Sequence, residues 1–176
     1  LDLEMWLPAV IDTSGNRRVR SGQPGYVSAS YGIRLLEKPR QLSRSEGGIH
    51  VYGNPHYWLD PINAKVIAKS VLEGLKRVSP SDSDYFDDNY KSFAEKIDKY
   101  MDVWESRMAP LKGRKVVSYH KTWIYFLKRF GMIEYATIEP KPGIPPSPSH
   151  IKQLIAGMKK DKVDIILLET FYSKRY

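Results

Sequence analysis

The sequence of 176 residues contains no cysteine. Disulfide bonds and thiolate metal sites are therefore excluded, which leaves histidine and carboxylate side chains as the only strong metal ligands. No run of about 18 apolar residues is present, so the sequence predicts no transmembrane helix. A charged segment followed by a short apolar segment, the pattern of a secretory signal peptide, is absent as well. The hydrophobic content of 41% is ordinary for a globular chain, and the length suffices for one large domain or two small lobes.

Motifs of several common enzyme and nucleotide-binding sites are also missing. No glycine-rich phosphate loop follows a predicted strand, and neither an HExxH helix nor a nucleophile elbow occurs. The formal net charge of +8 would suit a nucleic-acid partner, but lysine and arginine are scattered among acidic residues. A solvated basic surface accounts for this charge, so we expect no nucleic-acid partner. Binding of single strands stays open as an alternative because the chain is rich in tyrosine and tryptophan.

The most informative stretch runs from Gly53 to Pro61, with the sequence GNPHYWLDP. Proline fixes its own backbone and restricts the residue before it, so Pro55 and Pro61 make this segment a short rigid turn around His56. Asp60 is a suitable N-cap, and Pro61 a suitable first residue, for the helix that follows. A histidine on such a fixed turn is well placed to bind a ligand.

Helical periodicity marks three segments in the first two thirds of the chain. Apolar residues recur at helical spacing over residues 1–11, 61–78 and 84–108. Residues 16–30 show little periodicity and predict an irregular surface segment. The segment 84–108 is longer than most helices of a compact domain. It fits both a strut between two lobes and a helix packed on a single core, because periodicity does not separate the two.

From Lys112 onward the pattern alternates between strand and helix. Strands are expected at residues 115–119, 133–138 and 163–168, and helices at residues 122–130 and from Ser149, the expected N-cap. Such alternation predicts an α/β fold with a parallel sheet and a ligand site beyond the carboxyl ends of the strands. The polar residues at these ends are His120, Glu139 and Glu169. We expect all three to line the same edge of the sheet.

Two histidines and the nearby carboxylates make a set of ligands that suits zinc or manganese. His56 on the rigid turn and His120 at the strand end are the candidate metal ligands. Glu139 is a candidate third ligand, a candidate partner that orients His120, or a cap for the next loop. Glu169 has the same alternatives.

The other two histidines, His50 and His150, lack such a placement and are expected to be structural or solvent-facing. A histidine and carboxylate metal site with an open position also activates water in hydrolases. A metal-dependent hydrolase is therefore the alternative function at this point.

Three stretches carry a resemblance to a known family. They are residues 54–61 (NPHYWLDP), residues 119–126 (YHKTWIYF) and residues 139–148 (EPKPGIPPSP). Together they resemble the periplasmic metal-binding proteins of zinc and manganese ABC importers, and the likeness extends over almost the whole chain. Residues 1–7 are similar to the family's segment just after its second strand.

The resemblance implies two Rossmann-like α/β lobes with parallel sheets, joined by one long rigid helix, with the metal between the lobes. Residues 1–83 would form part of the N-terminal metal-binding lobe, residues 84–108 the linking helix, and residues 109–176 part of the C-terminal α/β lobe. Two further ligands of the family, a histidine near the start of the mature chain and a carboxylate near its end, have no counterpart here. We therefore expect two incomplete lobes and an internal portion of a longer protein.

The implied function is that of a non-enzymatic solute-binding protein of the periplasm or another extracytoplasmic space. It would capture Zn²⁺ or Mn²⁺ through His56 and His120 and deliver the ion, as a monomer, to the membrane permease of an ABC importer. Glu139 matches the family's loop without being one of its usual ligands. Zinc and manganese are not separated by the sequence, since both accept imidazole and carboxylate.

Overall fold

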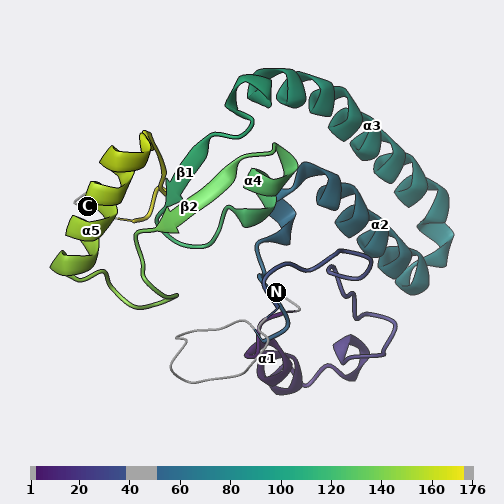
Figure 1. The fold of residues 1–176 in the computed structure, drawn as a ribbon. Coiled ribbons are helices and arrows are strands. Elements are labelled where there is room, and N and C mark those ends of the chain that lie inside the picture. The colour runs from purple at the N-terminus through teal and green to yellow at the C-terminus, as the bar shows by residue number, and fades with distance from the viewer. Residues whose placement is uncertain (1–2, 39–50, 173–176) are drawn as a thin grey trace.

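The computed structural model describes residues 3–38 and 51–172 of the chain (Figure 1). Within these ranges the chain forms helices and one sheet of three parallel strands, which confirms the α/β class predicted from the sequence. None of the helices in these ranges is both long and apolar enough to cross a membrane. The predicted extended stretch that carries His50 lies outside the described residues.

Residues 3–38 hold the short helix α1 (Leu7–Thr13), the 3₁₀ turn η1 (Arg17–Val19) and irregular segments. The sequence predicts a helix that is already formed at residue 1, but α1 begins only at Leu7. Pro8 explains the difference. A proline has no amide hydrogen to donate within a helix, so it is tolerated in the first turn, where no such hydrogen bond is made, and not in later turns. The irregular segment predicted after residue 16 is confirmed, apart from η1.

The rigid turn leads into the helix α2 (Pro61–Val78) through the 3₁₀ turn η3 (Tyr57–Leu59). The predicted cap is confirmed: the Asp60 carboxylate accepts a hydrogen bond from the Ile62 amide at 3.0 Å, and Pro61 occupies the first helical position. This cap satisfies one of the amides that every helix start leaves without an intrahelical partner. The direction in which α2 leaves the turn is therefore fixed locally.

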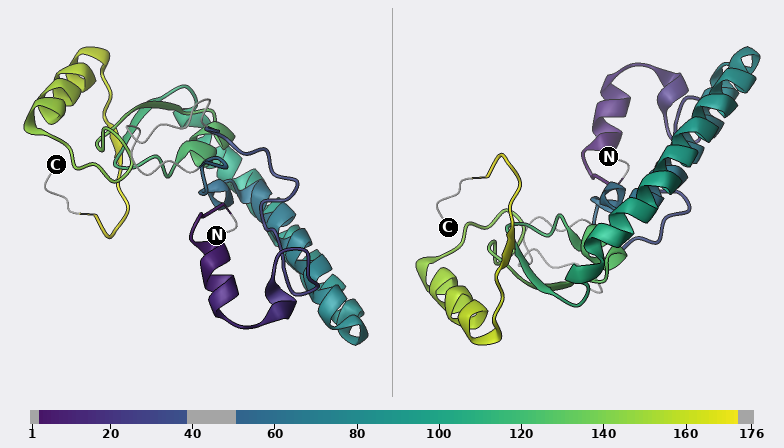
Figure 2. Two further views of the ribbon diagram at one scale, coloured as in Figure 1. Left: turned by 90° about the horizontal axis from the view of Figure 1, so that it is seen from below. Right: turned by 90° about the horizontal axis from the view of Figure 1, so that it is seen from above.

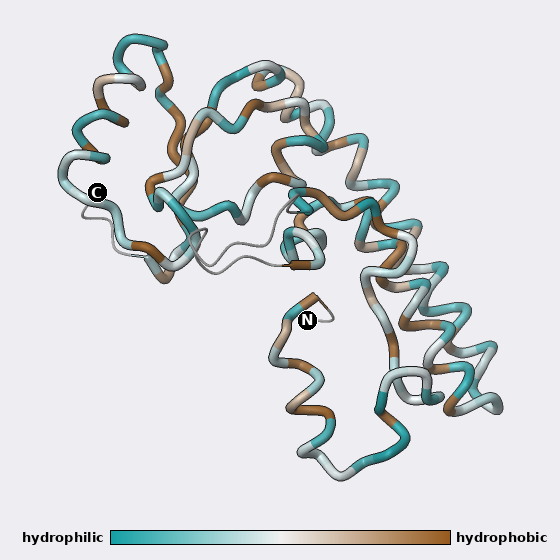
Figure 3. Tube along the Cα trace, turned by 60° about the horizontal axis from the view of Figure 1, so that its bottom comes forward, coloured by the Kyte–Doolittle hydropathy of each residue, from teal (hydrophilic) through white to brown (hydrophobic). Residues whose placement is uncertain are grey.

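Helix α3 (Ser83–Met108) follows α2 after the 3₁₀ turn η4 (Pro80–Asp82), and the two helices form a hairpin (Figure 1). Its 26 residues correspond to a length of about 39 Å, and the helix runs without a break from the hairpin toward the sheet, along an arc in Figure 1 and nearly straight in the views of Figure 2. Brown and teal segments alternate along both helices in Figure 3, as expected for helices with one apolar face. The 3₁₀ turn η5 (Ala109–Leu111) then leads into the first strand.

The sheet consists of β1 (Lys115–Ser118), β2 (Ile133–Thr137) and β3 (Ile165–Leu167), in the order β2-β1-β3. Each strand is shorter than predicted but lies where the sequence places it. Between β1 and β2 the register shifts by one residue, so that Tyr135 is an extra residue on β2. The central strand β1 is the most buried, and Val116, Val117 and Ser118 are fully enclosed.

Two helices connect the strands, and both begin at positions that differ from the prediction. Helix α4 (Ile124–Arg129) starts two residues late and is followed by Phe130 and by Gly131, whose φ of +68° suits the left-handed end of a helix. Helix α5 (Pro148–Asp161) is capped by Ser147 and not by the predicted Ser149. The reason is Pro148, which fits the first helical position and moves the cap to the residue before it.

Helix α4 belongs to two hydrophobic clusters at once. Its Leu127 packs with Val116 and Met132 under the sheet. Its Tyr125 packs instead with Leu3 and Tyr57, which belong to the first third of the chain. The α4 helix is therefore the structural link between the sheet and the turn that carries His56.

A bidentate ion pair adds to this link. The Arg129 guanidinium at the end of α4 donates from Nε and Nη2 to the two carboxylate oxygens of Asp60, at 2.7 and 2.8 Å. The same carboxylate caps α2, so one side chain both starts a helix and holds α4 against it. Paired, partly buried Arg–carboxylate contacts of this geometry are stronger than ordinary surface ion pairs.

Asp60→Ala is expected to lower the free energy of unfolding by about 2–3 kcal/mol, because it removes a helix cap and leaves the half-buried Arg129 without its partner. Asp60→Asn keeps an acceptor for the cap and should cost about 1 kcal/mol. Ser147→Ala, which removes only the cap of α5, is the matched control at about 1 kcal/mol. Urea unfolding followed by circular dichroism measures all three. Equal losses for Asp60→Ala and Ser147→Ala would show that the ion pair contributes nothing.

Candidate metal centre

His56 occupies the turn between Pro55 and η3 and is half-buried. Its amide donates to Asn54 Oδ1 at 2.9 Å, and its carbonyl accepts from the Leu59 amide at 3.1 Å. The backbone on both sides of this histidine is thus held by short local hydrogen bonds. The rigid turn that the two prolines predict is present.

His120 follows the central strand β1. The backbone of the preceding Tyr119 is still bound on both sides, since its amide donates to Leu167 O and its carbonyl accepts from the Glu139 amide, each at 2.9 Å. His120 is therefore the first residue beyond the sheet that is free to leave it. Glu139, just beyond β2, places its Oε2 at 2.7 Å from His120 Nδ1, and both side chains are largely buried.

The structure brings the two candidate ligands together. The rings of His56 and His120 lie edge to face, with centroids 5.7 Å apart and an interplanar angle of 84°. Two imidazoles bound to one zinc ion at about 2.1 Å would have centroids roughly 5 Å apart, which is close to the separation found here. Among residues 3–38 and 51–172, no group of three or more histidine, aspartate or glutamate side chains gathers as a metal site.

Glu139 has the geometry of an orienting partner. A carboxylate only accepts hydrogen bonds, so the contact with a neutral His120 requires the imidazole proton on Nδ1. The other ring nitrogen, Nε2, then carries the lone pair that binds a metal. This arrangement, in which a carboxylate fixes the tautomer of a ligand and raises its basicity, is common in metal sites.

Glu169 lies two residues beyond β3, but it makes no hydrogen bond to either histidine. Both of its carboxylate oxygens are buried without a hydrogen-bond partner among the described atoms. Burial raises the pKa of the nearby Tyr172, and the negative charges of Glu139 and Glu169 raise it further. Both carboxylates thus lie near this tyrosine at the same edge of the sheet, whereas only Glu139 contacts His120.

His150 lies in the first turn of α5, away from the histidine pair in sequence and in its contacts. Its Nε2 donates to the Thr137 carbonyl at 3.2 Å, which ties α5 to the end of β2. This contact agrees with the structural role expected for it.

A cluster of charged side chains lies beside the histidines. Lys121 Nζ is 2.7 Å from Glu37 Oε1, and Glu134 accepts a hydrogen bond from Ser118 Oγ at 3.1 Å. Burial alone would lower the pKa of Lys121, but its hydrogen bond to Glu37 and the charges of Glu37 and Glu134 raise that pKa above its usual value. Burial raises the pKa of Glu134, and Lys121 and His120 offset only part of that rise.

Sequence reasoning missed the contributions of Asn54, Glu37 and Lys121. Glu37 has a φ of +52°, a left-handed conformation that costs a non-glycine residue about 1–2 kcal/mol. Its carboxylate is held by Asn54 and Lys121, which accounts for how this conformation is maintained. No local sequence pattern marks Glu37. Asn54 stands next to Pro55 in the rigid turn, but the sequence pattern predicts only its restricted backbone and not the contacts of its side chain.

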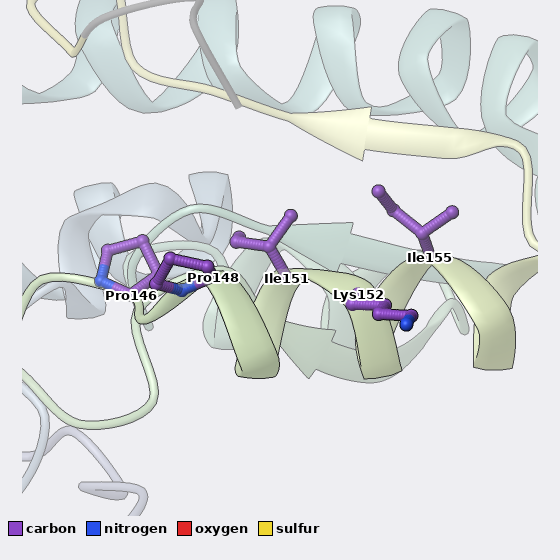
Figure 4. A pocket seen from close by; sticks show the side chains of 5 residues that line it. All are labelled: Pro146, Pro148, Ile151, Lys152 and Ile155. Atoms are coloured by element: carbon purple, nitrogen blue, oxygen red, sulfur yellow. The ribbon is translucent and has the colours of Figure 1, made fainter.

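An apolar groove along α5 is separate from this site. It is lined by Pro146, Pro148, Ile151, Lys152 and Ile155. In Figure 4 the two isoleucines point to the same side of the helix, and Lys152 lies along the helix between them. The groove offers no imidazole or carboxylate, so we do not assign it to metal binding.

Solved structures share this architecture. The crystal structure of ZnuA matches with a TM-score of 0.77 and 23% identity, covering 98% of this chain and 63% of that chain. The solute-binding protein FpvC of Pseudomonas aeruginosa, solved in complex with Mn²⁺, matches with a TM-score of 0.67 and 22% identity, covering 94% and 60%. The chain therefore has the same fold as the matching parts of these two proteins.

Sequence comparison gives the family. The zinc-binding lipoprotein AdcA of Streptococcus pneumoniae is 23% identical over 172 residues, which are 96% of this chain and 33% of that protein. All 176 residues match the family described as zinc-uptake complex component A, periplasmic, and the chain belongs to this family. The family's description names uptake and not catalysis, which removes support from the hydrolase alternative. The chain spans a third of the AdcA lipoprotein and less than two thirds of the ZnuA chain.

Glu134→Gln is expected to raise the free energy of unfolding at pH 7 relative to the original chain. The pKa of Glu134 is raised in the folded state, so this carboxyl favours folding at low pH and loses that contribution as the pH rises through its folded pKa. Glutamine has no charge to bury and still accepts from Ser118. Chemical unfolding at pH 4 and pH 7 should show a gain that grows with pH. An exposed control, Glu95→Gln, should show no such trend, and an equal gain at both pH values would contradict the assignment.

Proposed function

We propose that this chain belongs to an extracytoplasmic solute-binding protein that captures a divalent transition metal, Zn²⁺ or Mn²⁺. The observation that carries this proposal is the pairing of His56 and His120 from two separate loops, at a centroid distance of 5.7 Å. The hydrogen bond from His120 to Glu139 supports it, because such a contact prepares a histidine for metal binding. Family membership agrees with this chemistry.

The two imidazoles would supply two neutral nitrogen ligands. Four-coordinate zinc needs two more donors. In the proposed site these are water or groups that lie outside residues 3–38 and 51–172. A site with few protein ligands exchanges its metal more readily than a closed structural site, which suits a carrier that must release its cargo.

The choice between zinc and manganese rests on the ligands that complete the site. Imidazole binds both ions, and carboxylate oxygen shifts the preference toward manganese. The relative AdcA is named as zinc-binding, and the structural neighbour FpvC was solved with Mn²⁺. The proposal therefore includes both Zn²⁺ and Mn²⁺ as candidate cargo.

We further propose that residues 1–83 and 109–176 are parts of two lobes, with residues 84–108 as the linking helix. The single unbroken helix α3 supports this division. Because α4 packs against the His56 turn, the two parts share a hydrophobic core and are expected to move together as one stiff unit. The proposed partner is the membrane permease of an ABC importer, which a monomeric carrier in the periplasm or outside the cell would reach by diffusion.

His56→Ala and His120→Ala are each expected to weaken Zn²⁺ binding by the complete protein by more than about 100-fold, since each removes a direct ligand. His150→Ala is the matched control, because it removes a histidine of the same chain that binds only a carbonyl. Titration calorimetry with Zn²⁺ and Mn²⁺ measures the affinities. Unchanged affinity in both ligand variants would refute the proposed site.

Glu139→Gln is expected to weaken metal binding by about 10–100-fold, because the amide keeps the shape of the side chain but loses the negative charge of the carboxylate that orients the ligand. Glu169→Gln is the matched change at the other carboxylate of this edge and should leave the affinity within about threefold of the original. The same calorimetric titration applies. A larger loss for Glu169→Gln than for Glu139→Gln would reverse the assignment of the two carboxylates.

A further inference from the structure

Asn54 is the most completely bonded side chain near the two histidines, and it is only 6% exposed. Its Oδ1 accepts from the His56 amide at 2.9 Å. Its Nδ2 donates to the Lys121 carbonyl at 2.7 Å and to Glu37 Oε2 at 3.0 Å. Its own backbone is fixed as well, since its carbonyl accepts from Tyr125 Oη at 2.9 Å.

These contacts join the two histidine loops through one planar amide group. One end of the amide holds the backbone nitrogen of His56 itself. The other end holds the carbonyl of Lys121, the residue directly after His120. Because an amide is rigid and both hydrogen bonds are short, a movement of either loop away from the other must break a buried hydrogen bond.

We propose that Asn54 is a positioning residue for metal capture: it sets the separation of His56 and His120, and thereby the metal affinity, without touching the metal. This inference rests on the proposed function. It differs from a general role in stability because the two bonded groups are the backbones of the candidate ligand loops. Tyr57 and Tyr125 pack together in the same region, and Tyr125 Oη also donates to the Asn54 carbonyl, but neither side chain bonds to the backbone of the His120 loop in the contacts described.

Only an amide satisfies this position. An aspartate has the same shape and accepts from the His56 amide equally well, but its second oxygen would face the Lys121 carbonyl and the Glu37 carboxylate, both of which are acceptors. Asn54→Asp is therefore expected to separate the loops while the turn at His56 persists. Asn54→Ala removes both connections.

The chain offers a matched control. Asn63 donates from its Nδ2 to the Tyr57 carbonyl at 2.9 Å. This is a side-chain to backbone hydrogen bond of similar length to the one between Asn54 and Lys121. That bond lies within the turn and the start of α2 and does not reach the His120 loop. Asn63→Ala therefore removes a comparable bond without loosening the connection between the two histidines.

The test uses the complete protein and its Asn54→Asp, Asn54→Ala and Asn63→Ala variants. Calorimetry with Zn²⁺ should show a loss of about 10–100-fold for both Asn54 variants and a loss below about threefold for Asn63→Ala. Visible absorption of Co²⁺, which reports the coordination geometry, should change for the Asn54 variants alone. Thermal unfolding without metal compares the structural cost of the three changes.

The outcomes separate this inference from the proposed function. If His56→Ala and His120→Ala abolish binding but Asn54→Asp binds Zn²⁺ with the original affinity and Co²⁺ spectrum, the positioning role is wrong and the metal site stands. Equal losses of affinity for Asn54→Asp and Asn63→Ala would likewise overturn it, because the effect would then follow stability alone. If Asn54→Ala does not fold, the isosteric Asn54→Asp decides the question by the same measurements.

Discussion

The hydrogen bond from Asn54 Nδ2 to the Lys121 carbonyl is the interaction on which the geometry of the histidine pair depends. It connects residues that lie 67 positions apart and starts from a side chain that is only 6% exposed. A buried donor that loses its acceptor costs more than the bond itself contributes, so this contact resists separation of the loops. The ion pair of Arg129 with Asp60 and the packing of Tyr125 hold the same two parts from further away.

In the proposed carrier, the rigidity of this arrangement would favour metal binding, because two ligands that are held near each other beforehand lose little conformational freedom when the ion binds. The hairpin of α2 and α3 and the packing of α4 restrict the relative movement of the two loops. Selectivity and release would then depend on the remaining ligands, whose number and type differ between zinc and manganese sites.

The charged groups around the pair reinforce the same geometry. Glu37 holds Asn54 and Lys121 at once, although its own backbone is in a conformation that side chains rarely adopt. Glu139 fixes the tautomer of His120. Glu169, which the strand pattern ranks equally with Glu139, is buried at the same edge without contacting either histidine. The edge of the sheet therefore holds two carboxylates that the structure distinguishes by a single hydrogen bond.

The sequence by itself determined the α/β class, the approximate place of each strand, the Asp60 cap and the rigid turn at His56, because these features depend on neighbouring residues and on local periodicity. Helix starts at Leu7 and Pro148 were misplaced where a proline decided the boundary. Only the tertiary structure decided that His56 and His120 meet, that Asn54 joins their loops and that α4 serves two cores. The contacts of the two histidines, of Asn54 with Lys121 and of Tyr125 with Tyr57 join residues more than 60 positions apart, and their geometry follows from the packing of the chain and not from any local pattern.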